Sequence, residues 1–365
     1  MRQNRILIVL NDVSLSGVPV LILNLVKGLQ VNNPILFDFL INADGPLLSE
    51  FEQIGKIWPN FQQRPTSALK NIRNKIFNTR QTADIYSKIP WKKYDAVLFN
   101  SISTIHELKK IKQYFKRKTA LYVHELTAVQ TLFLNNLNPY GNVNKIITPS
   151  KTIAAFVSQK FDVDAESIAV LPYYIPQHSQ RREKASGFTI GCSGSFELRK
   201  GIDMILPLVR SLQKKGLDLK FIWKGVNTKS LEYLLIREDI IRAGLKNAIM
   251  LEEKNDDTSG FYNSIDLFVS LSREDPYPLV VLEAASYEIP SICFAQSGGI
   301  VDFIESFNGF VIPFLNIDEM VNVIIKYYTD RELLRVHGKK AKHALSVTHQ
   351  NIEKIAGELE SIFYS

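Results

Sequence analysis

The chain alternates short, continuously apolar runs with segments whose apolar residues recur at helical spacing. The first run, Arg5–Leu10, is followed by a polar loop and then by helical spacing over residues 19–29. Apolar runs of this length are typical of strands that are buried on both faces of a parallel sheet. Similar runs occupy residues 34–41, 95–100, 119–123 and 145–149. The pattern predicts an α/β unit with a parallel sheet.

The same alternation begins again in the second half of the chain. Its expected strands are residues 188–192, 219–223, 265–270 and 290–294, with a helix over 201–214. A stretch rich in proline and charge separates the two series, and 365 residues at roughly 150 per domain also predict two domains. The expected organisation is a first domain over 1–172, a linker over 173–186, a second domain over 187–345, and a C-terminal helix over 346–365 that crosses back to the first domain.

Composition and motifs exclude several classes of protein. Cys192 and Cys293 lie too far apart in the sequence for a CxxC metal site and are too few for a disulfide framework. Neither half carries the glycine-rich fingerprint of dinucleotide oxidoreductases or of P-loop NTPases. The apolar run near the N-terminus is too short for a signal peptide, and no run approaches the ~18 residues of a membrane span. We therefore expect a cytoplasmic protein, at most peripheral on the inner face of the cytoplasmic membrane.

The most informative stretch follows the expected strand that ends at Ser270. A polar loop leads to Pro278, which stands where the first helical residue is expected. The backbone N–H groups of Leu279 and Val280 would then point out of the helix start, where phosphate binds well. Glu283, about one and a half turns further on, suits the hydroxyls of a ribose. A capped helix with Glu283 on a solvated face explains the same pattern.

This stretch resembles the signature of retaining glycosyltransferases of the GT-B fold, family 4, in which two acidic residues flank seven others. On that pattern Asp275 is the first acid and Glu283 the second. The first acid of the family is usually Glu, so Glu274 competes with Asp275 for that place. The resemblance implies two Rossmann-like parallel-sheet domains facing each other across a cleft. It also implies transfer of a sugar from a nucleotide diphosphate sugar with retention of configuration and with no metal or other cofactor.

A second match follows the first expected strand of the second half. Lys200, directly before Gly201, resembles the family's lysine that neutralises the donor diphosphate. The family often has an arginine five or six residues earlier, where this chain has Gly194 and Ser195, so Arg199 is the candidate substitute. From the residues alone, Arg199 and Lys200 would be a solvated helix start.

Three further short stretches resemble the family. Gly298 and Gly299 match a glycine pair that lets the backbone approach the donor, and Gly17 matches a loop that closes over the donor phosphates. His124, followed by Glu125, matches a motif near the reacting carbon, and the carboxyl end of a parallel strand favours a site; a structural histidine is the alternative. The resemblance assigns catalytic roles to His124, Asp275 and Glu283, diphosphate binding to Gly17, Arg199, Lys200, Leu279 and Val280, and donor sugar or nucleotide binding to Glu274, Asp275, Glu283, Gly298 and Gly299.

Positive charge is concentrated in residues 64–118. This stretch has fourteen basic and three acidic residues, more than the whole chain's excess of +7. Within residues 69–80, apolar side chains recur at helical spacing with cations between them, which suits an anionic membrane surface; an ordinary solvated helix face explains the pattern equally well. The expected partners are a nucleotide-sugar donor, a glycan or lipid-linked glycan acceptor and an anionic membrane through residues 64–118, with no nucleic acid.

The expected function is therefore glycosyl transfer, in bacterial surface polysaccharide or lipopolysaccharide synthesis. Two alternatives keep the same fold: a sugar-nucleotide epimerase or hydrolase that needs no acceptor, and a non-catalytic glycan-binding protein. A nucleic-acid-binding protein would also explain the positive charge, but no such motif accompanies the cations and aromatic residues do not interleave with them.

Overall fold

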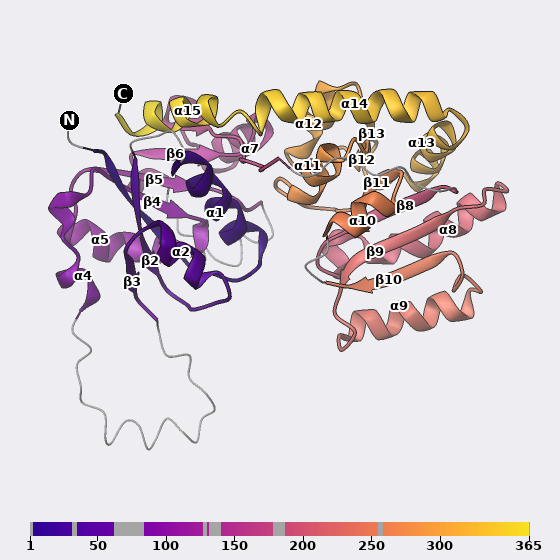
Figure 1. Ribbon diagram of the computed structural model, residues 1–365, viewed down its shortest axis with the longest axis horizontal. Coiled ribbons are helices and arrows are strands. Elements are labelled where there is room, and N and C mark those ends of the chain that lie inside the picture. Colours follow the sequence, from indigo (N-terminus) through magenta and orange to yellow (C-terminus); the bar gives the residue numbers. More distant parts are fainter. Residues whose placement is uncertain are drawn as a thin grey trace, which may run out of the picture. The chain divides into compact units, whose positions relative to one another are not determined.

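A computed structural model describes residues 3–30, 35–61, 84–126, 130, 140–177, 187–254 and 258–364 of the chain. The chain forms two compact units, shown in Figure 1. Unit 1 comprises Met1–Pro149, Ala154–Tyr174 and Ile352–Ser365, and unit 2 comprises Ser150–Ile153 and Ile175–Asn351. Each unit holds one parallel sheet, so the expected α/β class with two parallel sheets is confirmed.

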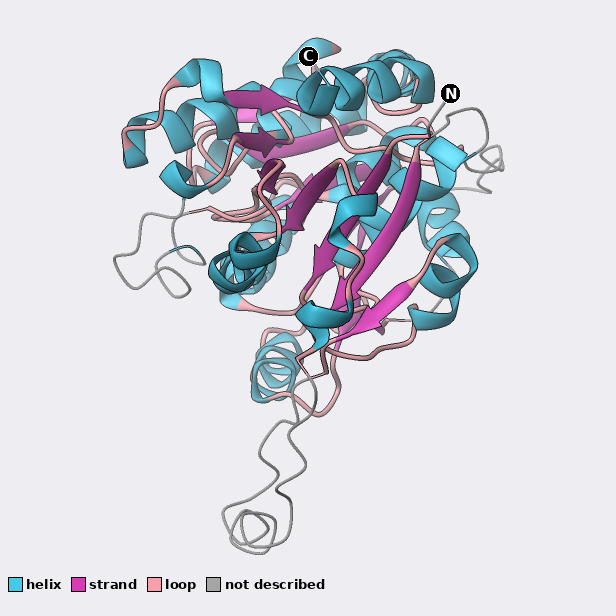
Figure 2. Cartoon of the chain, turned by 90° about the vertical axis from the view of Figure 1, so that its left-hand side faces the viewer, coloured by secondary structure: helices cyan, strands magenta, loops and turns pink. Residues whose placement is uncertain are grey.

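Unit 1 is built on a seven-stranded sheet in the order β3-β2-β1-β4-β5-β6-β7. In Figure 2 the left-hand side of the view in Figure 1 faces the reader, and the strands are drawn in magenta. Its strands are β1 (Arg5–Leu10), β2 (Leu36–Ile41), β3 (Ile57–Pro59), β4 (Ala96–Asn100), β5 (Lys118–Tyr122), β6 (Lys145–Thr148) and β7 (Ile168–Val170). Its α-helices are α1 (Gly17–Gln30), α2 (Leu48–Ile54), α4 (Ile85–Lys88), α5 (Leu108–Tyr114), α7 (Lys151–Phe161) and α15 (Ile352–Tyr364), and its short 3-10 helices are η1 (Trp91–Lys93), η2 (Ile102–Glu107), η3 (Tyr140–Asn142) and η4 (Ala165–Ser167).

The order of strands in unit 1 reverses direction between β1 and β4. β1 pairs with β2 on one side and with β4 on the other, all parallel. Because parallel crossovers are right-handed, helices that follow the strands before and after the reversal cover opposite faces of the sheet. The loops at the carboxyl ends of β1 and β4 therefore diverge and leave a crevice, which is where α/β proteins of this kind bind ligands.

Unit 2 repeats this plan with six strands in the order β10-β9-β8-β11-β12-β13, so its reversal lies between β8 and β11. Its strands are β8 (Thr189–Ser193), β9 (Lys220–Val226), β10 (Ile249–Glu253), β11 (Leu267–Ser270), β12 (Ser291–Phe294) and β13 (Phe310–Ile312). Its helices are η5 (Leu198–Lys200), η6 (Ile202–Met204), α8 (Ile205–Lys214), α9 (Leu231–Arg242), α10 (Thr258–Ser264), α11 (Leu279–Ser286), α12 (Ile300–Ser306), α13 (Ile317–Thr329) and α14 (Arg331–Thr348).

The core of unit 2 shows why its sequence forms these elements. On α8 the apolar residues recur three and four positions apart, and Ile205, Leu208 and Leu212 are buried against the sheet. On β9, Phe221 and Trp223 belong to the same cluster. Burying such side chains stabilises the fold by about 1.5–3 kcal/mol each relative to leaving them exposed. Packing of this core fixes where the strands end and hence where the loops of the site begin.

The apolar runs predicted the ends of the interior strands to within three residues, while the strands at the two edges of each sheet were not expected. The expected helix over 201–214 is divided into the 3-10 turn η6 and the helix α8. Residues 69–80, expected as an amphipathic helix, lie outside the described residues. None of the described helices is both long enough and apolar enough to cross a membrane.

Candidate functional site

The loops that follow β8, β11 and β12 meet one another and strand β9 at the carboxyl ends of the unit 2 strands. Backbone hydrogen bonds tie them together: the Gly194 N–H donates to the Lys224 carbonyl at 3.0 Å, and the Arg273 N–H donates to the Arg199 carbonyl at 2.9 Å. The Asp275 N–H donates to the carbonyl of Ser297 at 2.7 Å. The loops that hold the predicted donor-site residues therefore form one assembly at the reversal point of this sheet.

Lys200 and Asp275 form an ion pair in this assembly, although they are 75 positions apart in the sequence. The side chain of Lys200 is 15% exposed and that of Asp275 is 10% exposed, so both are mostly withdrawn from water. An ion pair at such a place is screened less by salt than one on the surface. The structure thus brings together one residue predicted for the diphosphate and one predicted for the donor sugar.

Two glycines are required by the close approach of these loops. Gly201 has φ +85°, and a Cβ there would lie 2.1 Å from the Leu271 carbonyl oxygen. Gly298 has φ +145°, and a Cβ there would lie 1.8 Å from the Asp275 carbonyl oxygen. Residues that have a side chain rarely adopt either backbone conformation. Gly298 thus lets the loop after β12 pack on the backbone of Asp275.

Helix α11 begins one residue later than expected. Pro278 has ψ 114°, so it is the cap residue, and Leu279 is the first helical residue. Leu279 and Val280 still occupy the first turn, whose N–H groups have no carbonyl one turn behind them. Glu283 is half-buried, and its carboxylate is held: the Tyr262 hydroxyl donates to it at 2.6 Å and also contacts the Val280 carbonyl at 3.2 Å. Burial, followed by the charge of Glu283, raises the pKa of Tyr262 well above its usual value.

Arg199 links two of the loops. Its guanidinium donates to the Glu274 carbonyl and to the carboxylate of Glu197, each at 2.7 Å. Its side chain is one-third exposed, compared with the more buried Lys200. In this arrangement the backbone of Glu274 is held by Arg199, while the carboxylate of its neighbour Asp275 is held by Lys200.

In unit 1, His124 lies at the end of β5 inside a hydrogen-bonded network. One ring nitrogen, Nε2, is 2.8 Å from Asn100 Oδ1, and the other, Nδ1, is 2.8 Å from the Tyr173 hydroxyl. His124 is only 6% exposed, and burial lowers its pKa to about 3. The ring is therefore neutral at physiological pH. Because a carbonyl oxygen only accepts, Nε2 carries the proton and Nδ1 accepts from Tyr173.

A cavity of about 190 Å³ lies at the reversal point of the unit 1 sheet. It is lined by the loop after β1, the start of α1, and residues that follow β4 and β5, including Asn100 and Glu125. Gly17, expected in a phosphate loop, is the first residue of α1 and is exposed. The Glu125 carboxylate accepts from the Ser101 hydroxyl and from the His124 N–H, and burial raises its pKa.

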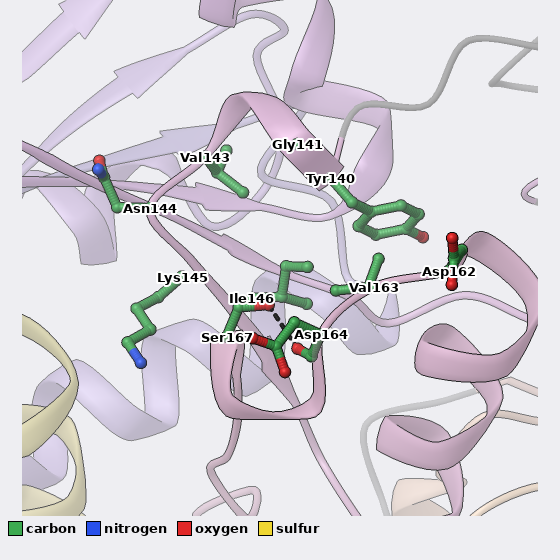
Figure 3. A pocket seen from close by; sticks show the side chains of 10 residues that line it. All are labelled: Tyr140, Gly141, Val143, Asn144, Lys145, Ile146, Asp162, Val163, Asp164 and Ser167. Atoms are coloured by element: carbon green, nitrogen blue, oxygen red, sulfur yellow. Dashed lines mark hydrogen bonds between the residues drawn. The ribbon is translucent and has the colours of Figure 1, made fainter.

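A second cavity of unit 1, of about 240 Å³, lies at the amino ends of β6 and β7 (Figure 3). The first cavity lies at the carboxyl ends of the strands, so the two are at opposite ends of the strands. Two of its lining residues, Asp162 and Asp164, form the one Asp-x-Asp triplet of the sequence. Asp164 caps the turn η4 by accepting from the Glu166 N–H at 3.1 Å. In the described part of the chain, no group of three or more His, Cys, Asp or Glu residues is placed to hold a metal ion.

Sequence analysis missed three residues that hold site residues in place. Tyr262, on α10, positions Glu283, and no local pattern marks it because the two are 21 positions apart. Tyr173 likewise contacts His124 across 49 positions. The sequence did mark Asn100, because it is the polar residue at the end of an otherwise apolar strand.

Comparison with known proteins agrees with this geometry. Residues 176–344 match the sequence model of the family described as "Glycosyl transferases group 1". This part of the chain is similar in sequence to the members of that family. The matched range contains Lys200, Asp275 and Glu283, so the family resemblance inferred from their sequence context is confirmed.

Two curated relatives and one solved structure extend the comparison. An uncharacterised glycosyltransferase of Haemophilus influenzae is 28% identical over 60% of this chain and 61% of its own length. The capsular polysaccharide biosynthesis glycosyltransferase CapM of Staphylococcus aureus is 25% identical over 42% of this chain and 40% of its own. The alignments thus span less than two thirds of either relative.

The solved structure of Anabaena Alr3699/HepE in complex with UDP and glucose superposes with a TM-score of 0.78. The superposition covers 99% of both chains at 16% identity. At this identity the likeness concerns the fold, and it confirms the GT-B architecture of two Rossmann-like units.

Proposed function

We propose that this protein is a glycosyltransferase that moves a sugar from a nucleotide diphosphate sugar to a glycan or lipid-linked glycan acceptor. One observation carries the proposal: the Lys200–Asp275 pair lies in the same loop assembly that leads into the first turn of α11. A cation and unpaired backbone N–H groups at a strand reversal point suit a diphosphate. The UDP-bound neighbour HepE and the polysaccharide relative CapM support the choice of donor and pathway class.

In the proposed reaction, the bond between the sugar's anomeric carbon and the diphosphate oxygen breaks, and the acceptor hydroxyl oxygen bonds to the same carbon. Negative charge develops on the leaving diphosphate, where Lys200 and the first N–H groups of α11 would stabilise it. The acceptor's proton passes to an oxygen of the leaving phosphate. Retention of configuration and independence of metal are part of this proposal.

The remaining site residues take positioning and binding roles in this scheme. Asp275 would accept from donor-sugar hydroxyls, and Glu283, fixed by Tyr262, would accept from the ribose. His124 is neutral and has both ring nitrogens engaged, so we assign it to holding Asn100 in place. Gly298 and Gly299 would let the backbone approach the donor.

Thermal-shift measurement with UDP, GDP, ADP and their sugars tests the donor half of the proposal. Binding to the folded state raises apparent stability by RT ln(1 + [L]/Kd), about 2.7 kcal/mol at a hundredfold excess over Kd. One nucleotide family should stabilise the protein and the others should not. No shift with any of them would refute a nucleotide-sugar site.

Product analysis tests the reaction itself. The stabilising donor is incubated with and without glycan acceptors in the presence of a chelator, and the anomeric configuration of the product is determined by NMR. The expected result is an acceptor-dependent product with the donor's configuration. An altered free sugar nucleotide made without any acceptor would instead identify an epimerase, and free sugar alone would identify a hydrolase.

We further propose that the protein works at the inner face of the cytoplasmic membrane, where a lipid-linked acceptor would be presented. In the described part of residues 64–118, Lys92, Lys93, Lys109 and Lys112 are all exposed. Clustered cations of this kind attract anionic lipids. Co-sedimentation with anionic vesicles but not with neutral ones is expected, and equal binding to both would contradict this assignment.

A further inference from the structure

Tyr277 lies inside the stretch from Asp275 to Glu283, and the sequence signature gives it no role. It stands directly before Pro278, the cap residue of α11, and its side chain is buried. Its hydroxyl lies 3.0 Å from Nε2 of His349, a residue 72 positions further along the chain. The two rings also contact each other, with their centroids 5.5 Å apart. The residue before the helix start is therefore tied to a distant segment of unit 2.

His349 is itself held firmly. It is the C-cap residue of α14, and its N–H donates to the Leu345 carbonyl at 2.8 Å. Its own carbonyl accepts from the Ile175 N–H, also at 2.8 Å. Its ring packs edge-on against Phe303 of α12. Because backbone bonds on both sides and a packed ring leave His349 little freedom to move, it can hold Tyr277 in one position.

The phenol of Tyr277 keeps its proton at physiological pH. Burial, followed by the charge of Asp302, raises the pKa of this phenol above its usual value. A protonated hydroxyl both donates and accepts, so it can form a hydrogen bond with Nε2 in either neutral tautomer of His349. The contact between the two side chains therefore does not require one particular tautomer.

The segment before α11 is also fixed by the loop after β12. The Pro276 carbonyl accepts from the Gly299 N–H at 2.8 Å. A Cβ on Gly299 would lie 3.0 Å from Cδ2 of Tyr277, so the tyrosine ring lies close against the backbone of that loop. Pro278 follows directly with φ −67°, the value that its ring imposes. The position of Tyr277 therefore sets where the first turn of α11 begins.

We propose that Tyr277 and His349 are positioning residues for the donor diphosphate. Their hydrogen bond fixes the start of α11 against the end of α14, so that the N–H groups of Leu279 and Val280 meet the phosphate oxygens without rearrangement. Donors that are already in place cost no reorganisation when charge develops on the leaving group. The inference rests on the proposed function and deepens it by naming residues that orient its diphosphate site. In this scheme neither residue touches the donor.

Binding of UDP and of uridine to the full-length protein tests the proposal, because uridine lacks the phosphates. Dissociation constants are measured by calorimetry for UDP and by NMR titration for uridine. Tyr277→Phe keeps the ring and removes the hydroxyl, so UDP should bind roughly fivefold to tenfold more weakly while uridine binds as before. His349→Leu should have the same effect. Unchanged UDP affinity in both folded variants, or equal weakening of UDP and uridine, would overturn the proposal.

Two further variants test whether the two side chains act as a unit. His349→Gln carries an amide that can reach the position of Nε2, so its UDP affinity should lie within about twofold of that of the natural protein. The double variant of Tyr277→Phe and His349→Leu should weaken UDP no more than the larger single effect, since both changes remove the same bond. Additive losses, or no rescue by glutamine, would refute the assignment.

Tyr327→Phe is the matched control. Tyr327 on α13 and His337 on α14 form another buried tyrosine–histidine pair of unit 2, with the hydroxyl 2.8 Å from Nδ1. Loss of this hydroxyl should lower the stability of unit 2 to urea about as much as Tyr277→Phe does, because the same kind of bond is removed. Its UDP affinity should stay that of the natural protein. An equal loss of UDP affinity in Tyr327→Phe would show an effect of stability alone and would refute the positioning role.

The natural protein separates this inference from the proposed function. If it binds UDP far more tightly than uridine and the Tyr277 and His349 variants leave that preference unchanged, only the inference fails. If no nucleotide binds the natural protein and no transfer product forms, the proposed function fails. Where GDP or ADP is the nucleotide that stabilises the protein, that nucleotide and its nucleoside replace UDP and uridine as the probes.

Discussion

The two units reverse their strand order at the same topological point but carry different charges there. In unit 2 the reversal between β8 and β11 carries Lys200 and Asp275 side by side, with Arg199 close to them along the chain. In unit 1 the reversal between β1 and β4 carries acids, amides and hydroxyls, and its histidine is neutral. The shared sheet order explains where the two candidate sites lie, and their side chains decide which class of ligand each suits.

Removing the cation of unit 2 should have the largest effect. Lys200→Ala is expected to lower sugar transfer at least tenfold and toward the roughly 10²–10³-fold that losing one charge-stabilising group costs. The measurement is the initial rate with saturating acceptor. Lys214→Ala, which removes an exposed cation at the end of α8, is the control and should be near normal. A normal rate in Lys200→Ala would mean that the charge at this reversal point does not define the ligand.

Neutralising Glu283 should have the next largest effect. Glu283→Gln keeps the shape of the side chain but weakens its acceptance from Tyr262 and from a ribose, so transfer should fall at least tenfold with the fold intact. Separate determination of KM for the donor and of kcat would show whether binding is lost. Rates close to those of the natural protein would count against Glu283 as a nucleotide contact.

The two adjacent acids of unit 2 can be compared directly. Asp275→Asn replaces a charged acceptor for the donor sugar's hydroxyls with a neutral one, which should weaken donor binding by about 1 kcal/mol, roughly fivefold. Glu274→Gln should have less effect, because the described link of Glu274 to Arg199 uses its backbone carbonyl. Donor affinity measured by calorimetry for both variants gives the order. The reverse order would transfer the first acidic role to Glu274.

The smallest effect should appear in the stability of unit 1. Burial lowers the folded-state pKa of His124 to about 3, below its unfolded value near 6.5. The unfolded state therefore binds more protons in this interval, and the stability present above pH 6.5 is lost as the pH falls. From pH 7.5 to 6.0 this loss is about 0.8 kcal/mol. Urea titrations of His124→Asn and the natural protein should differ in this pH dependence, and identical dependence would place a charged ring in unit 1.

The sequence patterns predicted the interior strands of each sheet but not its edge strands. The interior strands β1, β4 and β8 are almost continuously buried, so each is a clear apolar run. The edge strands β3, β7, β10 and β13 contain half-buried or exposed positions. An edge strand has a neighbour on one side only, so its sequence is not required to be apolar throughout. Local patterns therefore predicted the interior of each sheet and not its borders.

The residues of the candidate site also divide into those that the sequence predicted and those that it did not. Lys200, Asp275 and Glu283 were found from short motifs, because each stands at a fixed distance from a strand end or a helix start. Their partners were not found, since Tyr262 and Asn100 reach the site from other segments of the chain. The roles of the named residues stay predictions until the variants above are measured.

The sequence by itself determined two parallel α/β units, the approximate ends of their interior strands and the family signature around Asp275 and Glu283. These features depend on local spacing, which a single segment contains. Only the tertiary structure decided that Lys200 pairs with Asp275, that Tyr262 holds Glu283 and that His124 is neutral. Those outcomes depend on burial and on contacts between residues 75, 21 and 49 positions apart, which no local pattern records.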